Sequence, residues 1–170
     1  RSAPALDDVD APFDPRSDNT PGKPAKTVSL MARAVGYLSR REHSTVELTR
    51  KLAAFAQSAD EVAAVIDKLA AKGMLSDARY AASVMHRRGA KFGAARVAQE
   101  LKAQGVVGAD LESARDKLKD TELARCQEVW RRKFGQAAGS HEEAAKQARF
   151  LIQRGFATGV VMKVVKGAED

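Results

Sequence analysis

Residues 40–52 read RREHSTVELTRKL, and this stretch contains the features from which the fold is predicted. Ser44 and Glu47 have the S-x-x-E spacing of a capping box. In such a box the serine hydroxyl accepts a hydrogen bond from the N–H three residues later, and the glutamate reaches back to the N–H of the cap. Two leucines four residues apart follow, as on one face of a helix. The Arg40–Arg41 doublet before the box suits the end of a preceding helix. The stretch therefore predicts two short helices joined by a tight turn.

The same pattern recurs twice further along the chain. Arginine doublets are spaced by 47 and 44 residues and lie at 40–41, 87–88 and 131–132. The leucines of the helices that follow are spaced by 49 and 50 residues and are Leu52, Leu101 and Leu151. A period of this length, with about three capped helices in each, predicts a tandem array. We place three three-helix, helix-turn-helix-like repeats at residues 29–75, 76–120 and 121–170.

Other start and stop signals agree with a wholly helical chain. Two more capping boxes are Ser58–Glu61 and Ser140–Glu143, and simpler caps are Ser76, Thr121 and Thr158. The glycines that can close a helix in the left-handed conformation are Gly73, Gly105 and Gly155. An apolar residue follows each glycine and can fold back onto the last turn. Sustained alternation of apolar and polar residues is absent, so we predict an all-α protein without a sheet.

Residues 1–28 differ in composition from the rest of the chain. They contain all five prolines and five acidic against four basic side chains, whereas the remainder has 17 acidic and 25 basic. Such a segment buries too little apolar surface to offset the entropy of ordering, so we predict a disordered Pro/Asp-rich tail. The repeats, at about 45 residues each, are too small to be stable alone. We therefore expect them to stack into an elongated, curved body.

The residue types present exclude several classes of site. The 170 residues carry a net charge of +7 and include one cysteine, Cys126, so neither a disulfide framework nor a multi-cysteine metal site is expected. The histidines are isolated at His43, His86 and His141, and no P-loop motif is present. We predict no enzymatic activity, no metal and no cofactor, and we interpret Cys126 as a buried structural thiol. No apolar run is long enough to span a membrane, and residues 1–10 lack the layout of a secretory signal, which predicts a cytoplasmic protein.

Cations at matching positions form what we call the cationic stripe. Its members are the three arginine doublets and two nearby lysines: Arg40, Arg41, Arg87, Arg88, Lys91, Arg131, Arg132 and Lys133. A cation at a helix C-terminus gains about 0.3–1 kcal/mol from the helix dipole, which suffices to explain any single doublet. Three recurrences favour a binding role, because stacked repeats would place all three along one edge. Such a stripe suits nucleic-acid phosphates or an acidic protein groove.

Four segments resemble the RecX family of recombination regulators. The most specific combination is Arg41-Glu42-His43-Ser44 with Gly73-Met74-Leu75-Ser76-Asp77-Ala78-Arg79-Tyr80-Ala81, where the family pattern reads G-h-h-[SD]-D-x-R-[FY]-A. The other two are Gly93-x-x-Arg96-Val97-x-x-Glu100-Leu101-x-x-x-Gly105-Val106 and Phe150-Leu151-x-x-Arg154-Gly155-Phe156. Together the matches cover about residues 31–165.

This resemblance implies an all-helical regulator that binds the RecA recombinase along the groove of its DNA filament. It implies restraint of strand exchange, ATP hydrolysis and co-protease activity, in homologous recombination, DNA repair and the SOS response. Under this hypothesis the chain is a monomer that binds single- and double-stranded DNA weakly and without sequence preference, and the cationic stripe contacts acidic protein groups or DNA phosphates. Glu42, His43, Asp77 and Arg79 match family motifs, although caps and ties between helices explain them equally well. Trp130 is interpreted as a core anchor, with an exposed role at an interface as the alternative.

Two alternative functions fit the same pattern. A helix-turn-helix DNA-binding regulator without a RecA partner would be a dimer with a strong preference for one duplex site. A helical scaffold unrelated to nucleic acid would use its charges only to solvate its surface. In that case, removing Arg87 and Arg88 together would leave partner binding unchanged.

Overall fold

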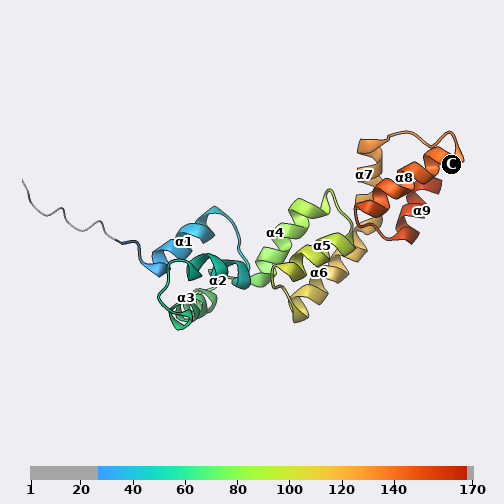
Figure 1. Cartoon of the computed structure of the whole chain (residues 1–170). Helices are drawn as coiled ribbons and strands as arrows, with labels where there is room; N and C mark the ends of the chain where they lie inside the picture. The colour runs from blue at the N-terminus through green and yellow to red at the C-terminus, as the bar shows by residue number, and fades with distance from the viewer. Residues whose placement is uncertain (1–26, 168–170) are drawn as a thin grey trace, which may run out of the picture.

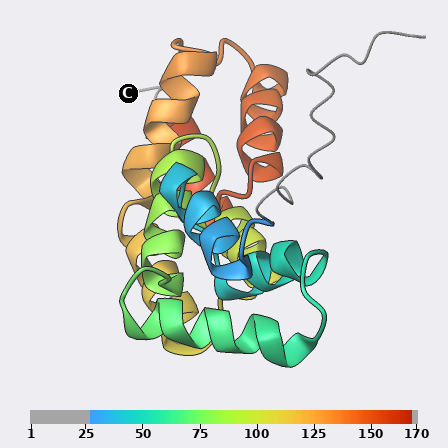
Figure 2. The ribbon, with the colours of Figure 1, turned by 90° about the vertical axis from the view of Figure 1, so that its left-hand side faces the viewer.

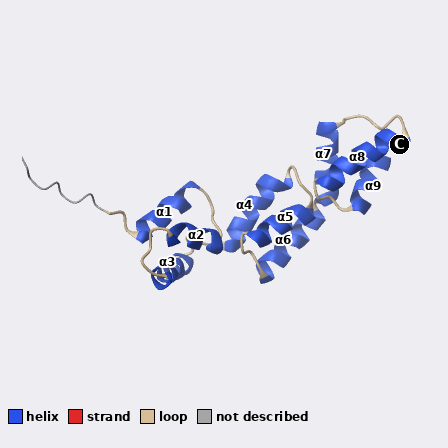
Figure 3. Ribbon diagram, in the orientation of Figure 1, coloured by secondary structure: helices blue, strands red, loops and turns tan. Residues whose placement is uncertain are grey.

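The computed structural model describes residues 27–167, so the tail predicted for residues 1–28 lies almost wholly outside the described range. Within that range the chain forms helices and no strand (Figure 3). The helices are α1 (Leu30–Arg40), α2 (Thr45–Ala53), α3 (Ala59–Ala71), α4 (Asp77–Gly89), α5 (Ala94–Ala103), α6 (Gly108–Asp120), α7 (Glu122–Lys133), α8 (His141–Gln153) and α9 (Thr158–Gly167). The predicted all-α class is confirmed.

The helices pack as three consecutive trios that lie in a row (Figure 1). We call α1–α3 the first unit, α4–α6 the second and α7–α9 the third; Figure 2 views the row from its N-terminal end. Each unit encloses its own hydrophobic core of mainly aliphatic side chains. Residues with no exposed surface include Leu48, Leu52 and Leu69 in the first unit, Val97, Leu101 and Val106 in the second, and Cys126, Leu151 and Val161 in the third. The elongated array of three-helix repeats is therefore confirmed.

Serine caps begin α2, α3 and α8, as the capping boxes predict. The hydroxyls of Ser44, Ser58 and Ser140 accept hydrogen bonds of 3.0, 3.2 and 3.2 Å from the backbone N–H three residues later. Each bond satisfies one of the N–H groups that the first turn of a helix leaves without an intrahelical partner. Local spacing alone therefore fixes where these three helices start.

The reciprocal half of the predicted boxes is wrong. The carboxylates of Glu61 and Glu143 accept hydrogen bonds from the N–H of the residue before the cap, at 2.9 and 2.7 Å, rather than from the cap itself. Glu47 bonds instead to the guanidinium of Arg41, because a charged donor at hydrogen-bonding distance competes with a backbone amide. In the first unit, the capping box thus contributes its glutamate to an ion pair.

Two of the simpler predicted caps also differ from expectation. Thr121 keeps nearly helical backbone angles at the end of α6, and its hydroxyl donates to the carbonyl of Lys117 at 3.2 Å instead of capping α7. α9 begins at Thr158 itself rather than after it. Ser76 caps α4 as predicted, accepting from the N–H of Arg79 at 3.2 Å.

The predicted glycine stops are present. Gly73, Gly105 and Gly155 have φ angles of +70°, +81° and +88°, the left-handed region that glycine adopts without steric cost. The apolar residues after the second and third of these glycines are buried, as expected. Met74 is 39 % exposed, and Leu75 takes the buried position instead, so the predicted fold-back is shifted by one residue in the first unit.

At both contacts between successive units, a carboxylate on the first residue of one unit binds the N-terminus of a helix in the preceding unit. Asp77, the first residue of α4, accepts a 2.7 Å hydrogen bond from the N–H of Thr45, the first residue of α2. Glu122, the first residue of α7, accepts a 3.3 Å bond from the N–H of Ala94, the first residue of α5. In both cases the following unit places a negative charge at a helix N-terminus of the preceding unit, where unpaired N–H groups and the helix dipole favour it.

We call the contact between the first and second units the first joint, and that between the second and third units the second joint. Close approaches of the chain complete both joints. A Cβ on Gly105 would lie 2.2 Å from the Val46 side chain across the first joint. A Cβ on Gly93 would lie 2.2 Å from the backbone of Gly155 across the second. The N–H of Gly93 also donates to the carbonyl of Arg154 at 2.8 Å. The second and third units therefore touch main chain to main chain, which fixes how their surfaces meet.

Candidate nucleic-acid interface

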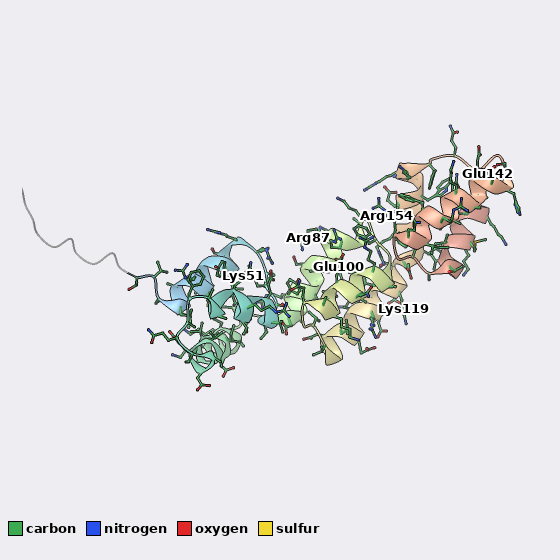
Figure 4. The ribbon with its side chains drawn as sticks, viewed as in Figure 1. Lys51, Arg87, Glu100, Lys119, Glu142 and Arg154 are labelled. Carbon is green, nitrogen blue, oxygen red and sulfur yellow. The ribbon has the colours of Figure 1, made fainter. Side chains whose placement is uncertain are left out.

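The arginine doublets lie at the carboxyl ends of the first helix of each unit. Arg40 ends α1, and the other two doublets fall in the last turns of α4 and α7. These three helix ends lie along the upper edge of the row in Figure 1. In Figure 4, Arg87 projects from this edge and Lys119 from the opposite one. Because the units repeat the same helix order in a row, equivalent helix ends recur on one side of the molecule.

In the first unit, one arginine of the doublet is ion-paired. The Arg41 guanidinium donates to both carboxylate oxygens of Glu47 and, at 3.0 Å, to the carbonyl of Glu42. The hydrogen bond to Glu47 raises the pKa of Arg41. Burial alone would raise the pKa of Glu47, but the bonds and charge of Arg41 outweigh it, so that pKa is lowered. Arg40 is exposed and has no ion-pair partner among residues 27–167.

In the second unit, the stripe lines a hollow of about 510 Å³ between α4 and α5. Arg88 makes a bidentate pair with Glu100, with bonds of 2.9 and 2.6 Å, and this hydrogen bonding raises the pKa of Arg88. Arg87 and Lys91 line the same hollow, are exposed, and pair with no carboxylate in the described part of the chain. This hollow therefore carries two uncompensated positive charges.

In the third unit, a single carboxylate serves both arginines of the doublet. Arg131 and Arg132 donate to Glu128 at 2.8 and 2.9 Å, and those hydrogen bonds lower the pKa of Glu128. Both arginine side chains remain at least 66 % exposed, so the two bonds add little to stability. Lys133 lies with its ammonium 5.4 Å from the centre of the Phe150 ring. One net positive charge of the doublet is left at this end of the edge.

This surface includes two further arginines, Arg96 and Arg154, which the doublet pattern did not indicate. We define the notch as the hollow of about 450 Å³ lined by Phe92, Arg96, Phe150, Gln153 and Arg154. It lies across the second joint, and Figure 4 shows Arg154 on the upper edge between the second and third units. Arg96 and Arg154 are isolated in the sequence, so no local spacing marked them. Both lie within the segments that resemble the RecX family, and this was the available signal.

The described residues contain neither a metal-binding group nor a membrane helix. In the range 27–167, no three His, Cys, Asp or Glu side chains gather closely enough to hold a metal ion. Of the helices described, none is both long and apolar enough to cross a bilayer.

Comparison with known proteins gives the family. Models of the first and third three-helix domains of RecX match residues 31–69 and 120–165. The regulatory protein RecX of Leptothrix cholodnii is 50 % identical over 142 residues, which are 84 % of this chain and 90 % of the relative. The chain belongs to the RecX family. The RecX protein of Ralstonia nicotianae is 47 % identical over 146 residues, covering 86 % of this chain and 92 % of the relative. The crystal structure of RecX from Lactobacillus salivarius shares the fold, with a TM-score of 0.66 at 20 % identity over 82 % of this chain and 94 % of that one.

The RecX motif residues around the first joint have structural partners. Arg79 donates to Glu42 at 3.0 Å and to the carbonyl of Gly73 at 2.7 Å. His43 is buried, with its Nδ1 3.0 Å from the carbonyl of Arg41 and its Nε2 2.9 Å from the ammonium of Lys51. Burial lowers the pKa of His43, and a neutral ring that accepts from the ammonium fits this geometry. These side chains tie helices and units together.

Trp130 occupies the position expected of a core anchor in the RecX third unit. Its ring packs against the third core, and its indole N–H donates to the Gln147 side chain at 2.8 Å. The bond satisfies the one polar group of a largely apolar ring, as is usual for a half-buried tryptophan.

We expect the thiol of Cys126 to resist modification in the folded protein. Its side chain has no exposed surface, and burial raises its pKa from 9.0 to about 11. A shift of two units leaves about a hundredfold less thiolate at pH 8, so a disulfide reagent should react at least ~100-fold more slowly than in denaturant. The chain has one cysteine, so the coloured leaving group that the reagent releases reports the reaction of this residue alone. Equal rates in native buffer and denaturant would contradict the burial of the thiol.

Proposed function

We propose that this RecX-family chain binds the RecA recombinase and the DNA in the groove of its filament, and restrains its recombinase, ATPase and co-protease activities. The observation that carries the proposal is the row of three units whose first helices all end on one edge, with the cationic stripe at those ends. Membership in a family of regulatory proteins supports a regulator rather than an enzyme.

The shape supports a mechanism of occlusion. A filament groove repeats the same protomer surface, and a row of similar units can match that repeat with several weak contacts. Linked contacts act at a high effective concentration, so the combined affinity exceeds that of any single unit. A body seated along the groove would exclude the incoming duplex or the co-protease substrate. In this proposal the protein acts as a monomer in the cytoplasm.

The members of the cationic stripe differ in how freely they can bind an external anion, because some of them are already paired with a carboxylate. Arg87 and Lys91 carry no internal partner among the described residues and are free to bind phosphates or acidic side chains. Arg88, by contrast, would have to leave or share Glu100 to bind an anion. DNA contact through unpaired cations releases counterions, so binding should weaken steeply with salt and show no sequence preference.

The test is inhibition of RecA ATPase on single-stranded DNA by the double variant Arg87→Ala with Lys91→Ala. We expect a loss of inhibition of about tenfold or more in the concentration required, since two uncompensated charges are removed from the centre of the edge. The matched control is Lys117→Ala with Lys119→Ala, two exposed lysines of α6 in the same unit, with Lys119 on the opposite edge (Figure 4). This control should inhibit like the unchanged protein.

A pull-down with RecA, with and without single-stranded DNA and a nucleotide analogue, distinguishes the alternatives. Capture that requires the assembled filament supports groove binding. A helix-turn-helix regulator would instead select one duplex sequence and ignore RecA. Full inhibition by the Arg87 and Lys91 double variant would remove the cationic stripe from the mechanism.

A further inference from the structure

The notch between the second and third units has the features of a built anion site. Its two arginines come from different units, Arg96 from α5 and Arg154 from the end of α8. The second joint brings them together, because the N–H of Gly93, the N-cap of α5, donates to the carbonyl of Arg154 itself. The spacing of the two guanidinium groups is therefore set by main-chain contact and not by flexible side chains alone.

Aromatic rings hold the arginine heads in place. The guanidinium carbons of Arg96 and Arg154 lie 4.0 and 5.2 Å from the centre of the Phe92 ring. Arg154 also lies 4.9 Å from the centre of the Phe150 ring. A guanidinium over an aromatic ring gains cation–π attraction while its N–H edges stay available to a second partner. Ordering the two heads in advance lowers the entropy lost when an anion binds.

The positive charge of the notch is not neutralised. Within residues 27–167, neither Arg96 nor Arg154 has a carboxylate within ion-pairing distance. Arg88 differs from these two arginines. Its guanidinium carbon also lies over the Phe92 ring, 4.3 Å from the centre, but its charge is paired with Glu100. The ammonium of Lys133 lies over the Phe150 ring and adds a further cation beside the notch. The two guanidinium forks are therefore preordered and have no internal carboxylate partner in the described part of the chain.

We propose that the notch binds the phosphodiester backbone of a single-stranded nucleic acid, and this inference rests on the nucleic-acid part of the proposed function. Guanidinium forks match phosphate oxygens in a bidentate geometry. Phe92 is only 8 % exposed, beneath three guanidinium groups, so it cannot stack on a base. The site therefore contacts backbone and not base edges, and it is indifferent to sequence.

Continuity along the edge favours nucleic acid over an acidic protein. Figure 4 shows Arg87 and Arg154 on the same upper edge, one beside the second unit's hollow and the other at the notch. A strand that leaves the notch meets the unpaired cations Arg87 and Lys91 next. A regular row of phosphates supplies a charge at each step of such a path, whereas a protein surface would need carboxylates at the same density.

The experiment measures binding of the full chain to a fluorescein-labelled oligothymidylate by fluorescence anisotropy, without RecA. The variant is Arg96→Gln with Arg154→Gln, and each lost contact removes about 0.7 from the slope of log K against log salt. We expect the slope to become shallower by about 1.4, and affinity at 0.1 M salt to fall about 25-fold. Arg96→Lys with Arg154→Lys keeps the charge without the fork and should fall between. Lys117→Gln with Lys119→Gln removes the same charge from α6, with Lys119 on the opposite edge, and should bind as the unchanged protein does.

The notch is supported if the glutamine variant melts like the unchanged protein and loses affinity for the oligonucleotide as expected. Phosphate is supported as the ligand if inorganic polyphosphate displaces the oligonucleotide and polyglutamate of equal charge does not. Equal competition by polyglutamate would overturn the assignment in favour of an acidic protein surface. If the glutamine variant binds the oligonucleotide normally, the notch inference fails, whereas the proposed inhibition of RecA ATPase is left to its own test. If the unchanged protein binds no oligonucleotide, the nucleic-acid part of the proposed function fails with it.

Discussion

Replacing Gly93 by alanine is expected to separate the third unit from the second while the helices of both remain. The φ angle of Gly93 is −72°, which alanine adopts freely, so the obstacle is space and not backbone strain. The added Cβ would lie 2.2 Å from the carbonyl group of Gly155 and from the nitrogen of Phe156. Main-chain atoms cannot rotate away as a side chain would, so the joint must open. We expect a loss of about 3 kcal/mol, at the upper end of overpacking costs, because the bond to Arg154 is lost as well.

Small-angle scattering and thermal unfolding measure this effect. The variant should show a larger radius of gyration with unchanged far-ultraviolet circular dichroism, and an earlier first transition on heating. Gly36→Ala is the matched control, since Gly36 lies within α1 and a Cβ there would meet no other atom within 4 Å. That substitution should stabilise slightly, by about 0.5–1 kcal/mol, because alanine favours the helix. If Gly93→Ala keeps the scattering profile and midpoint of the unchanged chain, the close approach does not hold the units together.

Substitution of Arg125 by leucine should destabilise the same region by about 3 kcal/mol, because several carbonyl acceptors lose the charged donor that satisfies them. The half-buried Arg125 guanidinium donates to the carbonyls of Gly89, Phe92 and Leu118 at 2.9, 2.7 and 2.8 Å, and to the Thr121 hydroxyl at 3.0 Å. Burial lowers the pKa of Arg125, since removal from water disfavours its charge. The carbonyls offset that cost. Those of Gly89 and Leu118 lie in the last turns of α4 and α6, where the helix dipole favours a cation, and that of Phe92 lies in the loop after α4.

Urea unfolding of the full chain provides the measurement. Arg125→Lys should recover only part of the loss, because an ammonium cannot serve four acceptors arranged for a planar fork. Arg115→Leu removes an arginine of α6 that makes one partly exposed pair with Glu112, and should cost about 0.5 kcal/mol or less. Equal midpoints for the leucine variants at 125 and 115 would show that the carbonyl network does not contribute to stability.

The start and end of most helices could be predicted because the interactions that set them span three to five residues. Ser44, Ser58 and Ser140 cap the helices expected of them, and Gly73 and its two counterparts close theirs. The period of the arginine doublets likewise predicted that first helices would end at equivalent places. Errors arose where a nearby charged group competed, as when Glu47 bonded to Arg41 rather than to the cap.

By itself, the sequence determined an all-helical chain of three similar units, its family, and cations at the ends of the first helices, because short-range spacing encodes capping, termination and repetition. Only the tertiary structure decided that Arg96 and Arg154 meet over Phe92, that Gly93 touches the backbone of the next unit, and that most of the stripe's arginines are paired internally. Those facts depend on how one unit stacks on the next, and no spacing within a helix specifies the distance between side chains on neighbouring units.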